Sequence, residues 1–291
     1  MSGVPVTLTA AAPAKLNLFL HVIGRRADGY HLLQSVFVLL DVCDTLHFSV
    51  RTDGGIHRQS DLPGVRAEDD LVVRVAKLLK REAQASTFPD AYGVNISVDK
   101  RLPMGAGLGG GSSDAATTLL ALNRLWNLGF SNGKLRALGL TLGADVPFFL
   151  YGRNAFAEGV GEQLLPVELP RWWYLVLVPP VHVPTQAIFA HPDLTRDTIP
   201  LKISDFSVNG LGDTHNDLQA VVLKTFPAVS RYLQALQSVC QKSVFGARMT
   251  GSGACVFAAF ASGQDARGAL ESLQPEYKGF VAQGLSRHPF S

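Results

Sequence analysis

The segment Pro103-Met104-Gly105-Ala106-Gly107-Leu108-Gly109-Gly110-Gly111-Ser112-Ser113 decides the fold of this chain. Its five glycines lie between residues 94–98, which alternate as in a strand, and residues 115–126, which are spaced as in a helix. Glycine lets the backbone approach a phosphate closely, and a helix that follows directly adds unpaired N–H groups and the positive end of its dipole. The segment therefore predicts a phosphate-binding loop, in which Ser112 and Ser113 cap the helix or contact phosphate.

Two common nucleotide motifs fit this segment poorly. Gly105, Gly107 and Gly110 satisfy G-x-G-x-x-G, but a dinucleotide-binding unit needs an acidic residue about twenty positions further on, and residues 124–130 contain none. The signature G-x-x-x-x-G-K-[ST] is broken at Gly133-Lys134-Leu135. A dehydrogenase is therefore a remote alternative. The alternative with no functional role is a flexible glycine loop with a serine cap.

Composition describes an ordinary globular chain. With 26 Lys plus Arg against 24 Asp plus Glu, the net charge of +2 gives no broad basic surface, so no nucleic-acid partner is expected. Cys43, Cys240 and Cys255 are odd in number and never form C-x-x-C, which favours a reducing cytoplasm over disulfides or zinc. The apolar run at residues 16–23 is too short to span a bilayer, so no membrane partner is expected.

Hydrophobic patterns mix strands and helices, which predicts an α+β fold. The expected strands cover residues 14–21, 36–40, 94–98, 174–178, 248–250, 255–260 and 280–285; the expected helices follow Asp69-Asp70 and cover residues 115–126 and 226–236. At 291 residues the chain is long enough for two domains, which we place at 1–167 and 168–291, with the last strand able to return to the first domain. Strand alternation would put Lys15, Asn17, Phe19 and His21 on one face.

Three segments in order resemble the three motifs of the GHMP kinases, the family of galactokinase, homoserine kinase and mevalonate kinase. They are Pro13–Leu18, the glycine segment, and Met249–Val256 with its turn Gly251-Ser252-Gly253. The resemblance covers essentially the whole chain. It implies a two-domain GHMP kinase fold, with an N-terminal ribosomal-protein-S5-like ATP-binding domain and a C-terminal ferredoxin-like α+β domain, and ATP-dependent phosphorylation of a small hydroxylated metabolite.

Within that family, three further segments resemble the members that phosphorylate a polyol carrying a cytidine diphosphate group, in the non-mevalonate route to isoprenoid precursors. These segments are Gly24–Leu33, Asp99–Met104 and Leu142–Phe149. Ala106 and Asp114 depart from the family pattern, where relatives often carry Gly and Asn, and we expect both to face tolerant surroundings. Competing functions are a kinase for homoserine or a mevalonate derivative and a non-catalytic nucleotide or sugar sensor.

The resemblance also implies a catalytic pair. Asp145 matches the aspartate that accepts the proton of the acceptor hydroxyl, and Lys15 matches the lysine that holds this aspartate and the hydroxyl. Read without the resemblance, Asp145 caps a helix and Lys15 extends from a strand edge. Mg²⁺ is expected with ATP; Ser112 or Ser113 are its candidate ligands, and we expect the ion to rest mainly on phosphates and water.

Residues matching the family's cytidine site complete the prediction. Tyr30 and Phe189 correspond to two aromatic walls around cytosine, and His31 corresponds to the ring that hydrogen-bonds the base edge. Candidates for further polar contacts to the acceptor are Asn17, Lys100 and Thr185. Read alone, Phe189 is equally a core residue. The segment Asn216-Asp217-Leu218 also resembles the family, without an assigned role, and the expected oligomeric state is monomer or homodimer.

Overall fold

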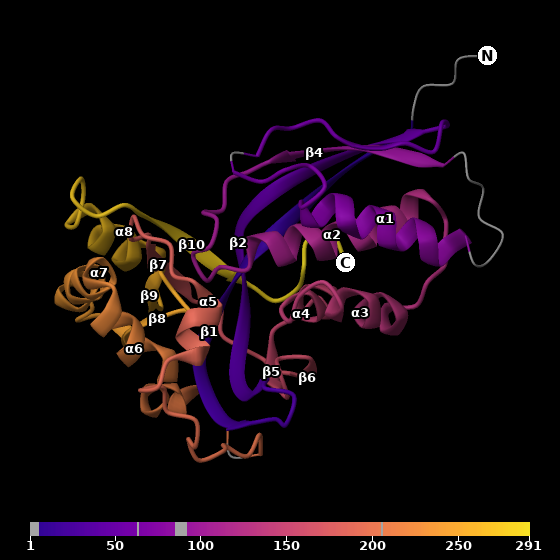
Figure 1. The fold of residues 1–291 in the computed structure, drawn as a ribbon. Coiled ribbons are helices and arrows are strands. Elements are labelled where there is room, and N and C mark those ends of the chain that lie inside the picture. The colour runs from indigo at the N-terminus through magenta and orange to yellow at the C-terminus, as the bar shows by residue number, and fades with distance from the viewer. Residues whose placement is uncertain (1–5, 63, 85–91, 205) are drawn as a thin grey trace.

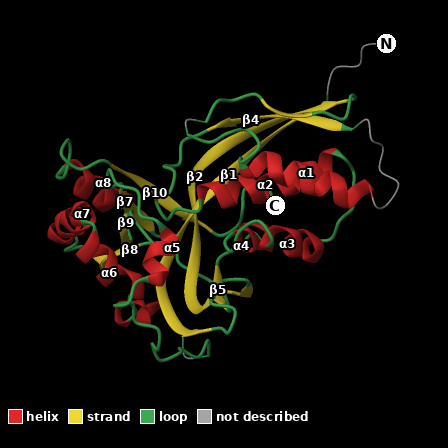
Figure 2. Ribbon diagram, viewed as in Figure 1, coloured by secondary structure: helices red, strands yellow, loops and turns green. Residues whose placement is uncertain are grey.

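The computed structural model describes residues 6–62, 64–84, 92–204 and 206–291, which fold as an α+β structure on one ten-stranded sheet (Figure 1; Figure 2). The sheet follows the order β3-β4-β2-β10-β7-β9-β8, while β1 pairs with β2, and β5 pairs with β2 and β6. The strands are β1 Thr7–Arg25, β2 His31–Arg51, β3 Ile56–Arg58, β4 Gly93–Asp99, β5 Ala155–Glu158, β6 Gln163–Pro166, β7 Trp173–Leu177, β8 Ser243–Met249, β9 Val256–Phe260 and β10 Gly279–Leu285.

The helices form two groups, one against each half of the sheet (Figure 1). Helices α1 to α4 gather beside β2 and β4, and α6 to α8 surround β7, β8 and β9. Their bounds are α1 Leu71–Gln84, α2 Gly110–Leu125, α3 Asn132–Leu140, α4 Val146–Tyr151, α5 Thr185–Ala190, a 3₁₀ helix Val208–Asp213, α6 Asp217–Thr225, α7 Pro227–Ser238 and α8 Gly263–Glu271. Among the described residues, no helix is both long and apolar enough to cross a membrane.

The antiparallel hairpin of β1 and β2 runs through both halves of the molecule (Figure 2). Its register shifts between Asn17 and Leu20, as at a β-bulge, and a bulge changes which side chains face each side of a strand. As a result Leu20 lines the same cavity as Lys15 and Asn17, whereas Phe19 is fully buried in the core. The expectation that Phe19 shares their face is therefore wrong.

The last strand joins the two halves of the sheet. Residues 279–283 of β10 pair with β7, and residues 284–285 pair with β2. The proposed boundary between residues 167 and 168 falls in the connection between β6 and β7 and stays a prediction.

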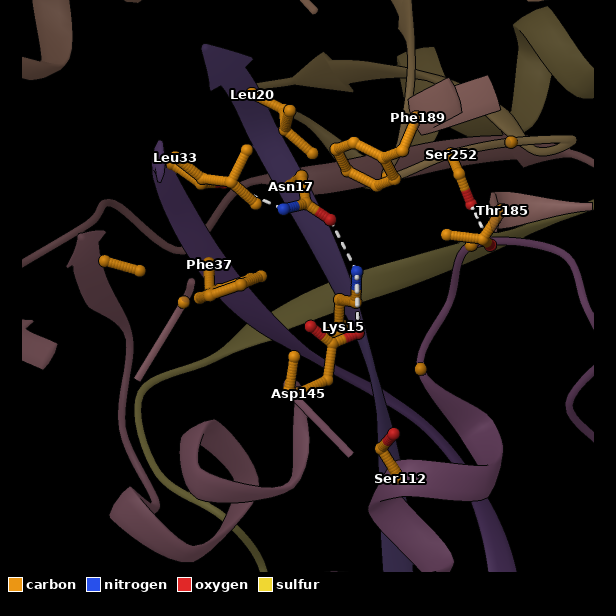
Figure 3. A pocket seen from close by; sticks show the side chains of 18 of the residues that line it. Lys15, Asn17, Leu20, Leu33, Phe37, Ser112, Asp145, Thr185, Phe189 and Ser252 are labelled. Atoms are coloured by element: carbon orange, nitrogen blue, oxygen red, sulfur yellow. Dashed lines mark hydrogen bonds and ion pairs between the residues drawn. The ribbon is translucent and has the colours of Figure 1, made fainter. Parts of the chain in front are cut away.

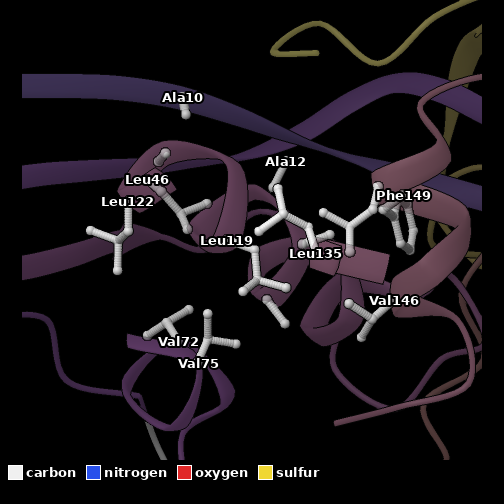
Figure 4. Close-up of a cluster of buried hydrophobic side chains, with 14 of the residues drawn as sticks. Ala10, Ala12, Leu46, Val72, Val75, Leu119, Leu122, Leu135, Val146 and Phe149 are labelled. Atoms are coloured by element: carbon white, nitrogen blue, oxygen red, sulfur yellow. The ribbon is translucent and has the colours of Figure 1, made fainter. Parts of the chain in front are cut away.

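Three clusters of buried apolar side chains form the core. One packs α1 and α2 against the first strands, as Val72, Leu119 and Leu46 illustrate (Figure 4). A second packs α6 and α7 against β7 and β9. The third, which includes Leu16, Val38 and Tyr174, lies where β1, β2 and β7 meet. Because this cluster contains side chains from both halves of the chain, it fixes one half against the other.

The strands and helices expected from sequence are confirmed. Each expected strand and helix overlaps an observed one, and the acidic start of α1 is explained by Asp70, whose Oδ1 accepts a hydrogen bond from the N–H of Val72. Sequence patterns missed the short helices α3, α5, α6 and α8 and the short strands β3, β5 and β6. Segments this short carry too few turns or alternations to give a periodic signal.

Candidate active site

The glycine loop leads into α2 without a serine cap. The N-cap is Gly109 at φ 72°, a left-handed conformation that glycine adopts readily, and no side chain caps this end. The helix thus begins before the serines, which lie in its first turn, and the expectation that Ser112 or Ser113 caps it is wrong. Ser112 lines the cavity described below, whereas Ser113 is buried.

Two backbone hydrogen bonds fix the glycine loop. The N–H of Lys15 donates to the carbonyl oxygen of Leu108 at 3.0 Å, and the N–H of Cys255 donates to that of Ala106 at 3.1 Å. A Cβ on Gly107 would lie 2.5 Å from the carbonyl oxygen of Thr250, so only glycine fits there. The loop is therefore held between β1 and the turn that follows β8.

A charged cluster lies beside the loop (Figure 3). The Nζ atom of Lys15 is 2.5 Å from Oδ1 of Asn17 and 3.4 Å from Oδ2 of Asp145, and Lys15 is only 3% exposed. Asn17 Nδ2 donates to Ser35 Oγ at 2.8 Å, which orients the amide so that its oxygen faces the ammonium. Asp145 precedes α4 but makes no capping bond, and its side chain is 33% exposed. Neither the capping role for Asp145 nor a Lys15 side chain extended to solvent is therefore observed.

Three cavities lie in a row around this cluster. The reaction cavity, about 300 Å³, is lined by Lys15 and Asp145; the glycine-loop cavity, about 400 Å³, by residues 103–112; and the aromatic cavity, about 550 Å³, by Tyr30 and His31. The reaction and glycine-loop cavities share Gly105, Gly107, Gly109 and Ser112. The reaction and aromatic cavities share Leu33, Ala144, Val160, Thr185 and Phe189. The charged pair thus lies between a glycine-rich wall and an aromatic one.

The aromatic cavity brings together the residues expected around a base. The rings of His31 and Phe189 lie 5.1 Å apart between centroids, and Tyr30 is 64% exposed. Thr185 Oγ1 and Ser252 Oγ are hydrogen-bonded at 2.6 Å, which connects this wall to the turn of the third motif. That turn, Gly251-Ser252-Gly253, lines the reaction cavity.

Lys100 lies beside the glycine-loop cavity. Its predicted contact with the acceptor would require a place beside the reaction or aromatic cavity. Its Nζ atom is 2.5 Å from Oδ2 of Asp44 and 2.6 Å from Oδ2 of Asp114, and the residue lines the glycine-loop cavity. It is absent from the described linings of the reaction and aromatic cavities, so this placement argues against an acceptor contact. Oδ1 of Asp44 also accepts from the N–H groups of Arg101 and Leu102, so this cluster anchors the chain that enters the loop.

Asp114 is buried in this cluster, so the expectation of tolerant surroundings is wrong for it. Burial raises the pKa of its carboxyl to about 7, and the nearby charge of Asp44 acts in the same direction against the opposing effect of Lys100. Burial also disfavours the ammonium of Lys100, but the two carboxylates outweigh it and raise the pKa of the lysine. One cation shared by two acids therefore leaves Asp114 close to its titration point at neutral pH.

Sequence reasoning noticed Asn216 and Asp217 without finding what they do. Nδ2 of Asn216 donates to the carbonyl oxygens of Met249 and Gly251, at 3.0 and 2.8 Å, and its Oδ1 accepts from the N–H of Leu218 at the start of α6. Asp217 accepts from the backbone N–H of Val22 at 2.6 Å. Both residues therefore position the third-motif turn and β1, and their partners lie too far away in sequence for a local pattern to indicate them.

Comparisons with known proteins show the family to which the chain belongs. The family model for the GHMP kinases N terminal domain matches residues 70–153, and the model for GHMP kinases C terminal matches residues 203–279. A 4-diphosphocytidyl-2-C-methyl-D-erythritol kinase from Thiobacillus denitrificans is 60% identical over 96% of this chain and 95% of its own length. The protein of the same name from Nitrosospira multiformis is 57% identical over 97% and 92%.

Solved structures give the same result. A crystal structure of 4-(cytidine 5'-diphospho)-2C-methyl-D-erythritol kinase superposes with a TM-score of 0.80 at 34% identity, over 95% of this chain and 99% of its own. Homoserine kinase from Cytophaga hutchinsonii superposes with a TM-score of 0.69 at 15% identity, over 99% and 97%, and so shares the fold. The predicted two-domain GHMP kinase fold of class α+β is thereby confirmed.

Replacing Gly107 with alanine tests the packing of the loop. The new Cβ meets the Thr250 carbonyl, and φ of +79° is unfavourable for alanine, so we expect the free energy of unfolding to fall by about 1–3 kcal/mol and ATP binding to weaken. Gly129→Ala is the matched control, because Gly129 has φ +66° but open space around its Cβ. Urea denaturation and calorimetric ATP titration measure both effects; equal losses in the two variants would contradict the predicted clash.

The Asp114 cluster predicts a pH-dependent stability. In the folded protein Asp114 keeps its proton up to about pH 7, whereas in the unfolded chain it loses it near pH 4. Between these values the folded state binds the extra proton, so this group lowers the free energy of unfolding as pH rises, by on the order of 1 kcal/mol per pH unit. Asp114→Asn removes this slope, and urea denaturation across this range should show the two proteins diverging. Parallel pH curves would refute the assignment.

Proposed function

The chain belongs to the GHMP kinase family, among its 4-diphosphocytidyl-2-C-methyl-D-erythritol kinases, and on this premise we propose that it transfers the γ-phosphoryl group of ATP to the 2-hydroxyl of 4-(cytidine 5'-diphospho)-2-C-methyl-D-erythritol. The observation that carries the proposal is the row of three cavities. A phosphate-binding wall, a lysine–carboxylate pair and an aromatic wall follow one another in the order that a donor, a reaction centre and a cytidine-bearing acceptor require.

The glycine-loop cavity is the proposed donor site. Its wall of five glycines allows phosphate oxygens to approach backbone N–H groups, and the first turn of α2 adds unpaired N–H groups and a positive dipole end. Because the loop also borders the reaction cavity, the terminal phosphate can extend toward Lys15 while the rest of the nucleotide stays in the glycine-loop cavity.

Asp145 is the proposed base of the reaction. As the acceptor hydroxyl oxygen attacks the γ-phosphorus, the bond to the bridging oxygen of ADP breaks and the hydroxyl proton passes to the Asp145 carboxylate. The ammonium of Lys15, held 3.4 Å from that carboxylate, stabilises negative charge as it moves from the hydroxyl to the phosphoryl oxygens. Asn17 keeps the ammonium in place through its Oδ1.

The aromatic cavity is the proposed acceptor site. Tyr30 is exposed and free to cover one face of the cytosine, and Phe189, shared with the reaction cavity, offers a second face. Stacking contributes on the order of 1–3 kcal/mol per base, so an aromatic pair adds substantial affinity. Thr185 lies between the base and the reacting hydroxyl in this arrangement, which suits a polar contact to the acceptor.

Mg²⁺ fits this site as an ion carried by the nucleotide. Among the described residues, no group of three or more His, Cys, Asp or Glu side chains is placed to hold a metal ion. Ser112 lines both the reaction and the glycine-loop cavities and offers a hydroxyl oxygen, the ligand type that Mg²⁺ prefers. The ion, when bound, neutralises phosphate charge. We further propose a cytoplasmic location, in keeping with three free cysteines.

Asp145→Asn tests the base. The amide keeps the size of the side chain but cannot accept the proton, so we expect kcat to fall by roughly 10²–10⁴-fold while ATP affinity is retained. A coupled ADP-release assay and calorimetric ATP titration measure the two quantities. Glu271→Gln, an exposed change on α8, is the control and should behave as wild type. Wild-type turnover in Asp145→Asn would remove this residue from the mechanism.

A panel of acceptors tests the substrate. With ATP present, we expect ADP release with 4-(cytidine 5'-diphospho)-2-C-methyl-D-erythritol and none above background with homoserine or mevalonate. Tyr30→Ala should raise KM for the cytidine substrate about tenfold or more, because one stacking face is lost. Turnover of homoserine or mevalonate instead would assign the fold to another acceptor, and ATP binding without any turnover would indicate a sensor.

A further inference from the structure

Arg196 hydrogen-bonds two residues that line the aromatic cavity, His31 and Phe189. Its Nε–H donates to Nε2 of His31 at 3.1 Å. One terminal nitrogen donates to the carbonyl oxygens of Phe189 and His191, each at 2.9 Å, and the other donates to that of Leu194 at 2.9 Å. Arg196 is absent from the described lining of the cavity, so it touches the walls and not the space between them.

The bond from Arg196 fixes where His31 carries its proton. A guanidinium has N–H donors and no acceptor, so the nitrogen that faces it must offer a lone pair. Nε2 of His31 is that nitrogen, which leaves Nδ1 as the N–H of the neutral ring. A histidine with no such partner is free to adopt either tautomer.

The surroundings also keep this ring neutral. Burial lowers the pKa of His31, and the positive charges of Arg196 and Arg25 lower it further. The charged groups of the cavity wall are Arg25 and Asp28, and Asp28 forms its ion pair with Arg26 at 2.7 Å. At neutral pH the ring therefore acts as a single-proton donor at Nδ1 and not as a cation.

Arg196 also fixes the position of Phe189. Carbonyl groups in the last turn of a helix have no partner within the helix, and α5 ends one residue after Phe189. The guanidinium satisfies the carbonyls of Phe189 and His191 and so connects the end of α5 to the start of β2, where His31 lies. The 5.1 Å separation of the two rings thus depends on a shared partner.

We propose that Arg196 is a positioning residue for base recognition, which holds His31 as the neutral Nδ1–H tautomer and ties it to the Phe189 wall. This inference rests on the proposed function. A fixed Nδ1–H donor suits cytosine, whose N3 is a hydrogen-bond acceptor, and opposes uracil, whose N3 carries a hydrogen. Selection of one pyrimidine over the other then depends on a side chain that does not touch the base.

The tautomer of His31 is measured without any substrate. Long-range ¹⁵N–¹H correlation spectra of the full-length protein, with ¹⁵N-histidine and with His31 assigned through His31→Gln, should show the Nδ1–H pattern in the wild type. In Arg196→Met the ring should shift toward the Nε2–H form, while Arg81→Met, an exposed change on α1, should leave it unchanged. An unchanged spectrum in folded Arg196→Met would overturn the proposal.

Pyrimidine preference is measured by inhibition with cytidine diphosphate and uridine diphosphate. Arg196→Met should reduce the preference for the cytidine compound and raise KM for the acceptor roughly tenfold, with a smaller change in kcat. In the His31→Gln background the same substitution should have little further effect on the preference, because Arg196 acts through His31. Additive effects, or an unchanged preference, would overturn the proposal.

Two controls separate the possible failures. If Arg196→Met does not fold, Arg196→Lys takes its place; an ammonium lacks the planar fork, so the Nδ1–H pattern should weaken, and a wild-type pattern would count against the proposal. If wild-type protein binds neither cytidine diphosphate nor the acceptor, the proposed function fails while the tautomer measurement still stands. Activity with the acceptor but no effect of Arg196 on tautomer or preference refutes only the inference.

Discussion

The buried ammonium of Lys15 is the constraint on which the rest of the site depends. A charge with 3% exposure is unstable unless it is paired and hydrogen-bonded, and among the described residues its polar partners are Asn17 and Asp145. Asn17 is in turn held by Ser35 on β2, so the charge is satisfied only when β1, β2 and the turn before α4 are all in place. The Lys15–Asp145 pair, our proposed catalytic pair, is therefore complete only in the folded chain.

Lys15 also connects the proposed donor site to Asp145. The backbone N–H of Lys15 binds the glycine loop at Leu108, while its side chain reaches Asp145. On the opposite side, the Thr250 hydroxyl accepts from the N–H of Asn17, and Asn216 binds the carbonyl oxygens on either side of Thr250, those of Met249 and Gly251. Strand β1 therefore sets the distance between the glycine loop and Asp145, the proposed base.

Sequence indicated the parts of the site that are encoded locally. The glycine loop is a contiguous segment, and an alternating strand was enough to put Lys15 and Asn17 on one face. The sequence could not indicate the bulge, which puts the side chain of Leu20 in the cavity in place of that of Phe19, because a bulge depends on the partner strand. Nor could it place Lys100, whose position is set by Asp44, 56 residues away in the chain. Long-range pairing of buried charges has no local pattern, so such roles emerge only in the folded molecule.

The central claim is that donor, base and acceptor occupy the three cavities in that order. A crystal structure of the protein with a non-hydrolysable ATP analogue and 4-(cytidine 5'-diphospho)-2-C-methyl-D-erythritol tests it most directly. The account predicts the analogue's phosphates on the glycine loop, the cytosine between Tyr30 and Phe189, and the 2-hydroxyl within about 3 Å of the Asp145 carboxylate. A cytosine bound elsewhere, or a 2-hydroxyl that points away from Asp145 and the terminal phosphate, would contradict it.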